Sequence, residues 1–258
     1  MIRKTLFPAG AFMACLCAGI AIMTLLSCGM GGRGLVQESA LVTAIDMGMA
    51  NAYLVRAGDG FVLIDTGMPM QWSEFESALK KAGALPGRLK LVVLTHGDID
   101  HAGNAASLQK RYGAKIAMHR GDAEMVEKGA LPAREIKTVR GRIIMLAGKL
   151  MGRRNALPLF TPDVLLDDAQ SLKAYGLDAT VVHLPGHTKG SIALLTSGGD
   201  LFIGDMVFNF SEPETPIFVQ DNAELKASYS RLVTLDAKTV YPGHGRPFPM
   251  ERVRALSL

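Results

Sequence analysis

The amino-acid sequence predicts a layered α/β domain that follows a separate apolar leader. The chain has 258 residues, a length that allows one large domain or two small ones. Short β-rich runs occur in two halves of the chain, with amphipathic helical segments between them, an order typical of packed α/β layers. A net charge of +4 and a hydrophobic content of 48% exclude a disordered chain and do not indicate a polyanion-binding one.

The first half of the body begins with a predicted hairpin. Two β-rich runs flank Gly58-Asp59-Gly60, a turn signal of the kind that joins antiparallel strands. Beyond the hairpin the apolar pattern alternates between the helical and the extended period. We expect strands at 51–56, 61–65, 89–94 and 115–119, and helices at 72–82, 102–111 and 122–128.

The second half is again rich in strands, and a basic segment separates it from the first. Residues 134–154 contain seven Lys and Arg side chains and a single acid, Glu135, interleaved with apolar residues. This segment is interpreted either as a solvated helix that covers the core or as a basic amphipathic element at a substrate mouth or membrane surface. We expect strands at 164–166, 179–184, 191–196, 201–204 and 239–241, and a helix at 223–235.

Residues 1–34 are predicted to be an export leader with a glycine-rich linker, and residues 35–258 to be the body. Arg3 and Lys4 precede a long apolar stretch that ends in Leu-Leu-Ser-Cys-Gly at 25–29, which resembles the lipobox of bacterial lipoproteins. The alternatives are an uncleaved N-terminal anchor and an ordinary cleaved signal. All three imply export to a bacterial cell envelope. In the lipoprotein and the anchor alternatives, the membrane attachment is a lipid at Cys28 or the apolar segment.

The three cysteines of the chain all lie within this leader. The body therefore has no cysteine, which excludes a disulfide framework and a cysteine nucleophile from it.

Metal-ligand side chains gather where predicted strands end. The run Thr-His-Gly-Asp-Ile-Asp-His at 95–101 contains two histidines and two aspartates directly after a strand. Such a group is costly to hold together unless a cation neutralises the carboxylates. One further ligand-type residue follows each of three later strands, among glycines or prolines: His187, Asp205 and His244. The order predicts a metal site, whereas His119 is expected to be structural and His183 to lie in the core or beside the site.

These motifs resemble the metallo-β-lactamase fold hydrolase superfamily over roughly residues 41–248. The resemblance implies an αββα four-layer sandwich with two metals at the strand ends. It implies that His96, Asp98 and His187 hold one ion, that Asp100, His101 and His244 hold the second, and that Asp205 bridges them. The candidate catalytic residues are Asp100, to orient the nucleophile, and Asp65, to orient a metal-bound imidazole.

The expected cofactors are two divalent metal ions, with zinc ranked first. The family usually has His where this chain has Asp98, and a harder oxygen ligand favours iron or manganese relative to zinc. Two cations about 3.5–4 Å apart would lower the pKa of a bridging water and supply hydroxide near neutral pH.

The function expected from these features is that of an exported dinuclear-metal hydrolase acting on an ester, thioester, lactone or related carbonyl substrate. The alternatives are a β-lactamase, a phosphodiesterase and a non-hydrolytic di-iron or manganese redox protein. The expected partner is a small molecule, a lipophilic one if the basic segment lines the mouth, and no nucleic acid. The oligomeric state is left open.

Overall fold

The structure, a computed structural model, describes residues 34–256 except 49, 131, 137–138, 140, 144 and 147–156. These residues belong to a compact unit that spans Gly32–Leu258. The predicted leader lies outside the described residues, apart from Gly34, with which the first strand begins. In the part of the chain that is described, every helix is too short or too polar to cross a bilayer.

One sheet has seven strands in the order β1-β2-β3-β4-β5-β6-β8. Neighbouring strands are antiparallel from β1 to β4 and parallel from β4 to β8. The predicted hairpin is the β3–β4 pair, which closes with Ala57 opposite Gly60. The strands are β1 (Gly34–Gln37), β2 (Val42–Asp46), β3 (Asn51–Ala57), β4 (Gly60–Ile64), β5 (Leu89–Val93), β6 (Ile116–His119) and β8 (Val164–Leu166).

A second sheet has five strands in the order β16-β15-β11-β10-β9. Only the β11–β15 pair is parallel, and the other neighbours are antiparallel. The strands are β9 (Ala179–His183), β10 (Ile192–Thr196), β11 (Asp200–Gly204), β15 (Thr239–Pro242) and β16 (Phe248–Pro249).

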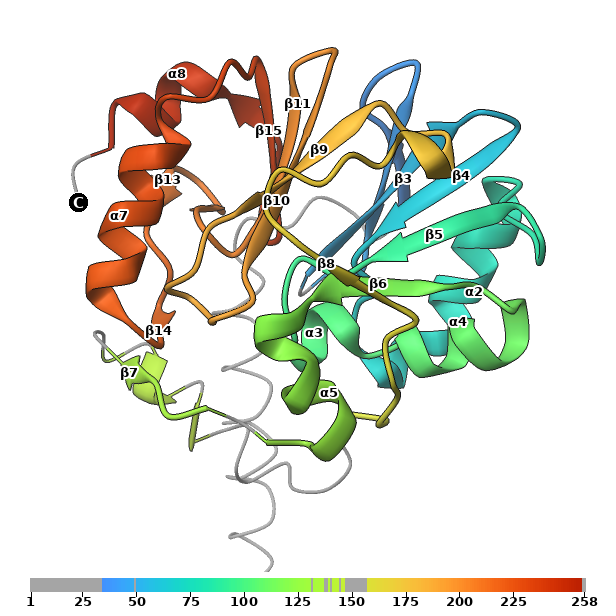
Figure 1. Ribbon diagram of the computed structural model, residues 1–258, viewed down its shortest axis with the longest axis horizontal. Helices are drawn as coiled ribbons and strands as arrows, with labels where there is room; N and C mark the ends of the chain where they lie inside the picture. Colours follow the sequence, from blue (N-terminus) through green and yellow to red (C-terminus); the bar gives the residue numbers. More distant parts are fainter. Residues whose placement is uncertain are drawn as a thin grey trace, which may run out of the picture. The chain divides into compact units, whose positions relative to one another are not determined.

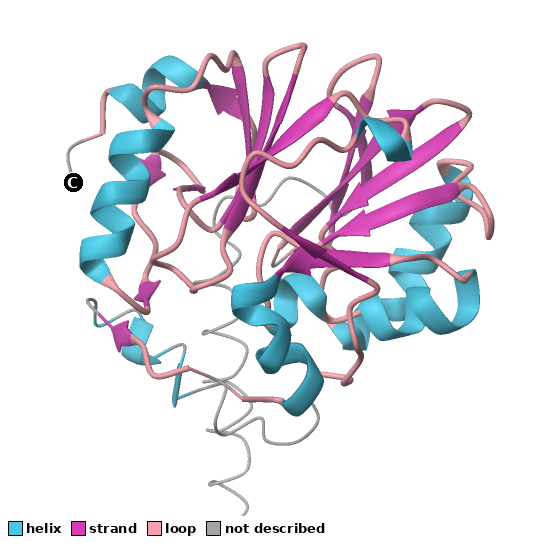
Figure 2. Ribbon diagram, viewed as in Figure 1, coloured by secondary structure: helices cyan, strands magenta, loops and turns pink. Residues whose placement is uncertain are grey.

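The two sheets pack face to face, and helices cover their outer faces, which confirms the αββα sandwich. Figure 1 shows α2 (Trp72–Lys81) and α4 (Ala105–Tyr112) against the seven-stranded sheet, with α7 (Asn222–Leu232) and α8 (Met250–Arg254) beyond the five-stranded sheet. Figure 2 shows the strands between these helices.

Side-chain alternation along the strands produces these layers. In β4, Val62 and Ile64 pack between the sheets, whereas Leu63 points to the outer cluster with the side chains of α2 and α4. In β9, Val181 packs between the sheets and Val182 packs under α7 and α8. Because successive side chains of a strand point to opposite faces, one apolar strand supplies two core layers.

The helix expected at 102–111 is wrong in its extent, because the structure contains two helices there. They are α3 (Ile99–Ala102) and α4, separated at Gly103 and Asn104. A Cβ at Gly103 would lie 2.5 Å from the carbonyl oxygen of Gly67, and the Asn104 side-chain amide donates to the carbonyl oxygens of Thr66 and Met68 at 2.7 and 3.0 Å. This close approach to the loop after β4 ends α3.

Two small sheets of two-residue strands also form near the ends of the main strands. β7 (Glu135–Ile136) pairs with β14 (Phe218–Val219), and β12 (Phe208–Asn209) pairs with β13 (Pro213–Glu214). Such short strands have no periodicity for the sequence to reveal.

Candidate metal centre

The loops at the carboxyl ends of four strands, one from the seven-stranded sheet and three from the five-stranded sheet, meet at one place. His96 and Asp98 follow β5, and Asp100 and His101 lie in α3, directly after them. His187, Asp205 and His244 follow β9, β11 and β15. The structure brings all seven predicted ligands together, because they form three overlapping groups whose potential ligand atoms lie within 4.8 Å of one another.

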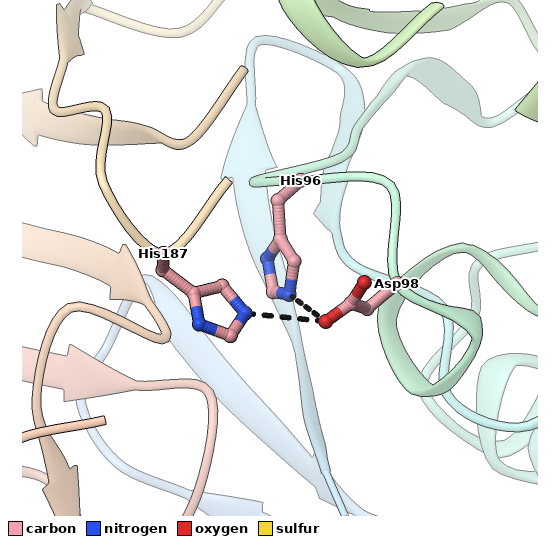
Figure 3. A group of neighbouring side chains, drawn as sticks. All are labelled: His96, Asp98 and His187. Carbon is pink, nitrogen blue, oxygen red and sulfur yellow. Dashed lines mark hydrogen bonds and ion pairs between the residues drawn. The ribbon is translucent and has the colours of Figure 1, made fainter. Parts of the chain in front are cut away.

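The first group consists of His96, Asp98 and His187 (Figure 3). Oδ2 of the Asp98 carboxylate approaches both imidazoles: it is 3.5 Å from His96 Nε2 and 3.2 Å from His187 Nε2. Both histidines are 1% exposed, and the aspartate is 16% exposed. The three side chains point toward one another from loops that begin on different sheets.

The second group consists of Asp100, His101 and His244. Asp100 Oδ2 lies 3.9 Å from His101 Nε2 and 3.5 Å from His244 Nε2, and the two Nε2 atoms are 3.5 Å apart. Burial alone would lower the pKa of His101, but the surrounding carboxylates, led by Asp205 and Asp65, raise that pKa well above its ordinary value.

Asp205 connects the two groups. Its Oδ1 lies 3.1 Å from His101 Nε2, and its Oδ2 lies 3.3 Å from His244 Nε2 and 3.6 Å from His187 Nε2. Burial would raise the pKa of Asp205, but His244 and His101 outweigh it and hold the pKa well below its usual range. The carboxylate therefore stays ionised between the imidazoles.

Three of the imidazoles are oriented from outside the cluster through Nδ1. His101 Nδ1 is 2.8 Å from Asp65 Oδ2, His187 Nδ1 is 2.7 Å from the carbonyl oxygen of Phe218, and His96 Nδ1 is 3.1 Å from Thr95 Oγ1. A carboxylate and a carbonyl can only accept, and the Thr95 hydroxyl already donates to Asp65. Each Nδ1 therefore carries a proton and donates, and each Nε2 faces inward, where it can become a ligand of a bound cation.

Asp65, the residue expected to orient one of the imidazoles, lies beside His101. Its Oδ1 accepts the backbone N–H of Thr95 at 2.8 Å, and its φ of 59° is unusual for a residue other than glycine. The strained backbone and the fully used carboxylate fix the direction of the His101 ring.

Structural observations that do not depend on the sequence motif also indicate that these side chains suit divalent cations. Within the described residues, His96 Nε2 and Asp205 Oδ1 are buried without a hydrogen-bond partner, a costly state that a cation would relieve. A Cβ at Gly243 would lie 2.6 Å from His101 Cε1, so this glycine leaves the imidazole room. Four nitrogen and three carboxylate ligands suit zinc as well as iron or manganese.

Two residues of the site were not foreseen from the sequence. Arg134 binds Asp98 through Nη1 and Nη2 of its guanidinium. The presence of Asp98 could have indicated such a partner, because an additional, partly buried carboxylate favours a cation beside it. Asp122 accepts the backbone N–H of Gly97 and of Gly190 and the hydroxyl of Thr188. No local pattern could reveal Asp122, because its partners lie in two distant loops.

The remaining histidines form a separate pair. The rings of His119 and His183 stack, with centroids 3.8 Å apart and planes inclined by 16°. His119 Nδ1 accepts the backbone N–H of Gly121, and burial together with His183 lowers the pKa of His119. These contacts agree with the structural role expected for His119, and they place His183 beside it at the end of β9.

The model of the metallo-beta-lactamase superfamily matches residues 45–244. A probable metallo-hydrolase of Bacillus subtilis, YflN, is 24% identical over 83% of this chain and 87% of its own length. The human acyl-coenzyme A thioesterase MBLAC2 is 26% identical over 81% of this chain and 77% of its own. The beta-lactamase-like protein 2 homolog of Drosophila melanogaster is 25% identical over 79% of this chain, and the match spans only 61% of that relative.

Solved structures of similar fold include TTHA1623 in a di-iron-bound form. It has a TM-score of 0.59 and 28% sequence identity, and the match covers 79% of this chain and 91% of that one. The subclass B3 metallo-beta-lactamase BJP-1 of Bradyrhizobium japonicum has a TM-score of 0.65 at 18% identity, covering 84% and 79% of the two chains. The latter likeness concerns the fold alone.

Proposed function

The chain belongs to the metallo-beta-lactamase superfamily and is a metal-dependent hydrolase, and we propose on this premise that it hydrolyses an ester, thioester or lactone. The observation that carries the proposal is the single cluster of four imidazoles and three carboxylates. Among carbonyl substrates, thioesters come first, because a relative of 26% identity is named an acyl-coenzyme A thioesterase.

Each group of the cluster would hold one divalent ion. His96, Asp98 and His187 form the first candidate site, and Asp100, His101 and His244 form the second. Asp205, whose two oxygens face both groups, would be shared. Zinc is our first choice, because it is bound by both imidazole and carboxylate ligands. The di-iron form of TTHA1623 supports iron as the alternative.

The residues around these sites have separate tasks in hydrolysis. When bound, two divalent ions would supply Lewis acidity toward a carbonyl oxygen and make water nucleophilic near neutral pH. Asp100, at 22% exposure, is more accessible than Asp205 at 6%, so its carboxylate can accept a proton from the attacking water and return it to the leaving group. Asp65 keeps His101 turned inward throughout.

A substrate panel with Asp100→Asn tests this proposal. The panel contains an acyl thioester, an aryl ester, a lactone, a phosphodiester and a chromogenic cephalosporin, with metal content and absorption spectrum recorded for each preparation. We expect hydrolysis of a carbonyl substrate by the wild type and a loss of about 10²–10⁴-fold in kcat for Asp100→Asn. The exposed Asp167→Asn, whose wild-type carboxylate pairs with Arg120 on the surface, is the matched control.

The outcomes of that panel separate the alternatives. Equal rates for Asp100→Asn and wild type would refute the role of the carboxylate. Cleavage of only the phosphodiester or only the cephalosporin would assign the phosphodiesterase or the β-lactamase function. Iron absorption without hydrolysis of any substrate would favour the redox protein.

We also propose that residues 1–34 direct export and attach the body to a membrane of the cell envelope. Support comes from Arg3 and Lys4, the apolar stretch after them and the lipobox-like Cys28. Cys28→Ala should remove incorporation of a labelled fatty acid and leave the precursor uncleaved. Normal processing of this variant would eliminate the lipoprotein form of the proposal.

A further inference from the structure

A partly buried ion pair lies at the edge of the first candidate metal site. The guanidinium of Arg134 binds both carboxylate oxygens of Asp98 in a two-pronged contact. The two side chains are 15% and 16% exposed. Among the ion pairs of the described residues, this is the one that brings an Arg or Lys side chain to the cluster.

The position of Arg134 is set by the same short sheet that orients His187. Arg134 directly precedes β7, and β7 pairs with β14, with Ile136 opposite Phe218. The carbonyl oxygen of Phe218 accepts the Nδ1–H of His187. One two-stranded ladder therefore positions both the imidazole and the cation that face Asp98.

The charges of the cluster explain why a cation is needed there. Asp98, Asp100 and Asp205 bring three carboxylates into one buried group. An imidazole in place of Asp98 would supply a neutral ligand. A carboxylate instead adds a negative charge, and its side chain is shorter and can rotate. The positive charge of the Arg134 guanidinium compensates the added negative charge of Asp98. The two-pronged contact also restricts rotation of the Asp98 carboxylate. Asp98 Oδ2 still lies 3.2 Å from His187 Nε2 and 3.5 Å from His96 Nε2.

We infer that Arg134 is a positioning residue for the first metal site, and that Asp98 and Arg134 act together as one neutral, oriented ligand unit. The inference rests on the ligand assignment of the proposed function. Its consequence is a dependence of each residue on the other. Arg134 should favour metal binding when Asp98 is present and oppose it when a neutral side chain replaces Asp98, because the guanidinium is then an uncompensated buried charge beside a cation.

The test is a double-variant cycle in which the binding of Zn²⁺ is measured directly. The number of bound ions and their dissociation constants are obtained for the full chain by metal analysis and by competition with a chromophoric chelator. The variants are Arg134→Gln, Asp98→His and the combination of both. Arg134→Lys, which keeps the charge and loses the fork, is added to separate orientation from charge.

We expect Arg134→Gln to weaken the first zinc site about 10–100-fold, the usual effect of removing a partner that orients a ligand. Arg134→Lys should give an intermediate loss. In the Asp98→His background the sign should reverse, so that adding Arg134→Gln strengthens the first site at least about tenfold. Arg120→Gln is the matched control, because Arg120 also makes a two-pronged contact to a carboxylate, that of Asp167, on the exposed surface. The zinc affinity of this variant should equal that of the wild type.

Each other outcome has a defined meaning. Unchanged or stronger zinc binding in Arg134→Gln, or additive effects of the two substitutions, would overturn the inference and leave the ligand assignment intact. A wild-type chain that binds fewer than two zinc ions would overturn the ligand assignment and the inference with it. Circular dichroism of the metal-free variants establishes that they fold; if Arg134→Gln does not, the comparison of Arg134→Lys with wild type decides, and equal affinity refutes the inference.

Discussion

At the scale of single residues, the direction of each imidazole is decided by what its Nδ1 contacts. Asp65, Thr95 and the carbonyl oxygen of Phe218 each occupy one Nδ1. These contacts select one tautomer and turn three Nε2 atoms toward a common centre. Contacts that hold ligand side chains in one orientation reduce the entropy lost when a metal is coordinated.

Asp65→Asn tests that orientation. The amide would present an NH₂ group toward His101 Nδ1–H or toward the Thr95 N–H, so one of these donors would lose its acceptor. We expect zinc affinity at the second site to fall about 10–100-fold, measured by competition with a chromophoric chelator. The control is Asp59→Asn, whose exposed carboxylate pairs with Lys90. Equal affinities for the two variants would contradict the role assigned to Asp65.

At the scale of elements, Asp122 joins the loops that carry the ligands. It lies at the end of the short helix η2 (Arg120–Asp122), and it accepts from Gly97 in the loop after β5 and from Thr188 and Gly190 in the loop after β9. A Cβ at Gly190 would lie 2.6 Å from Asp122 Cγ. Position 190 therefore requires a glycine, because the Asp122 carboxylate lies so close to it. The hydrogen bonds of Asp122 hold the loops after β5 and β9 at a fixed distance from each other.

Asp122→Ala should destabilise the fold through this junction. The substitution leaves two buried backbone N–H groups without acceptors, and each costs about 1–3 kcal/mol. We expect the free energy of unfolding in urea to fall by about 3 kcal/mol. Asp167→Ala, which removes an exposed carboxylate, should cost less than about 1 kcal/mol. A similar loss in both variants would contradict the role assigned to Asp122 in joining the two loops.

At the scale of the whole body, both sheets supply ligands to one centre. His96, Asp98, Asp100 and His101 follow a strand of the seven-stranded sheet, whereas His187, Asp205 and His244 follow strands of the five-stranded sheet. Bound ions would therefore link the two halves of the sandwich. The unfolded chain has no such site, so the ions bind only the folded chain and stabilise it.

Metal removal should lower the thermal stability of the protein. At a free metal concentration of about 100 times the dissociation constant, one ion contributes about 2.7 kcal/mol. For a chain of this size that corresponds to a decrease in Tm of roughly 5–10 °C. Calorimetry with a chelator, and with the same chelator presaturated by zinc, measures the difference. Identical Tm values in both conditions would argue against ions that bridge the sheets.

Much of the architecture could be predicted because its signals are local. The strands at 51–57, 60–64 and 179–183 lie within two residues of their expected bounds, since alternation of buried side chains is visible in the sequence. The break between α3 and α4 was not visible, because it depends on the contact of Gly103 with the loop after β4. The two-residue strands β7 and β14 were likewise not visible, because each is defined by its pairing with the other.

The sequence by itself determined which side chains could bind metal and where along the chain they lie, because a histidine or aspartate after a strand is a local feature. Tertiary structure alone decided the partners that complete the site. Arg134 reaches Asp98 across 36 positions, and Asp122 reaches Gly190 across 68. Charge compensation and hydrogen bonding act through space, so their partners are set by how the two sheets and their loops pack together.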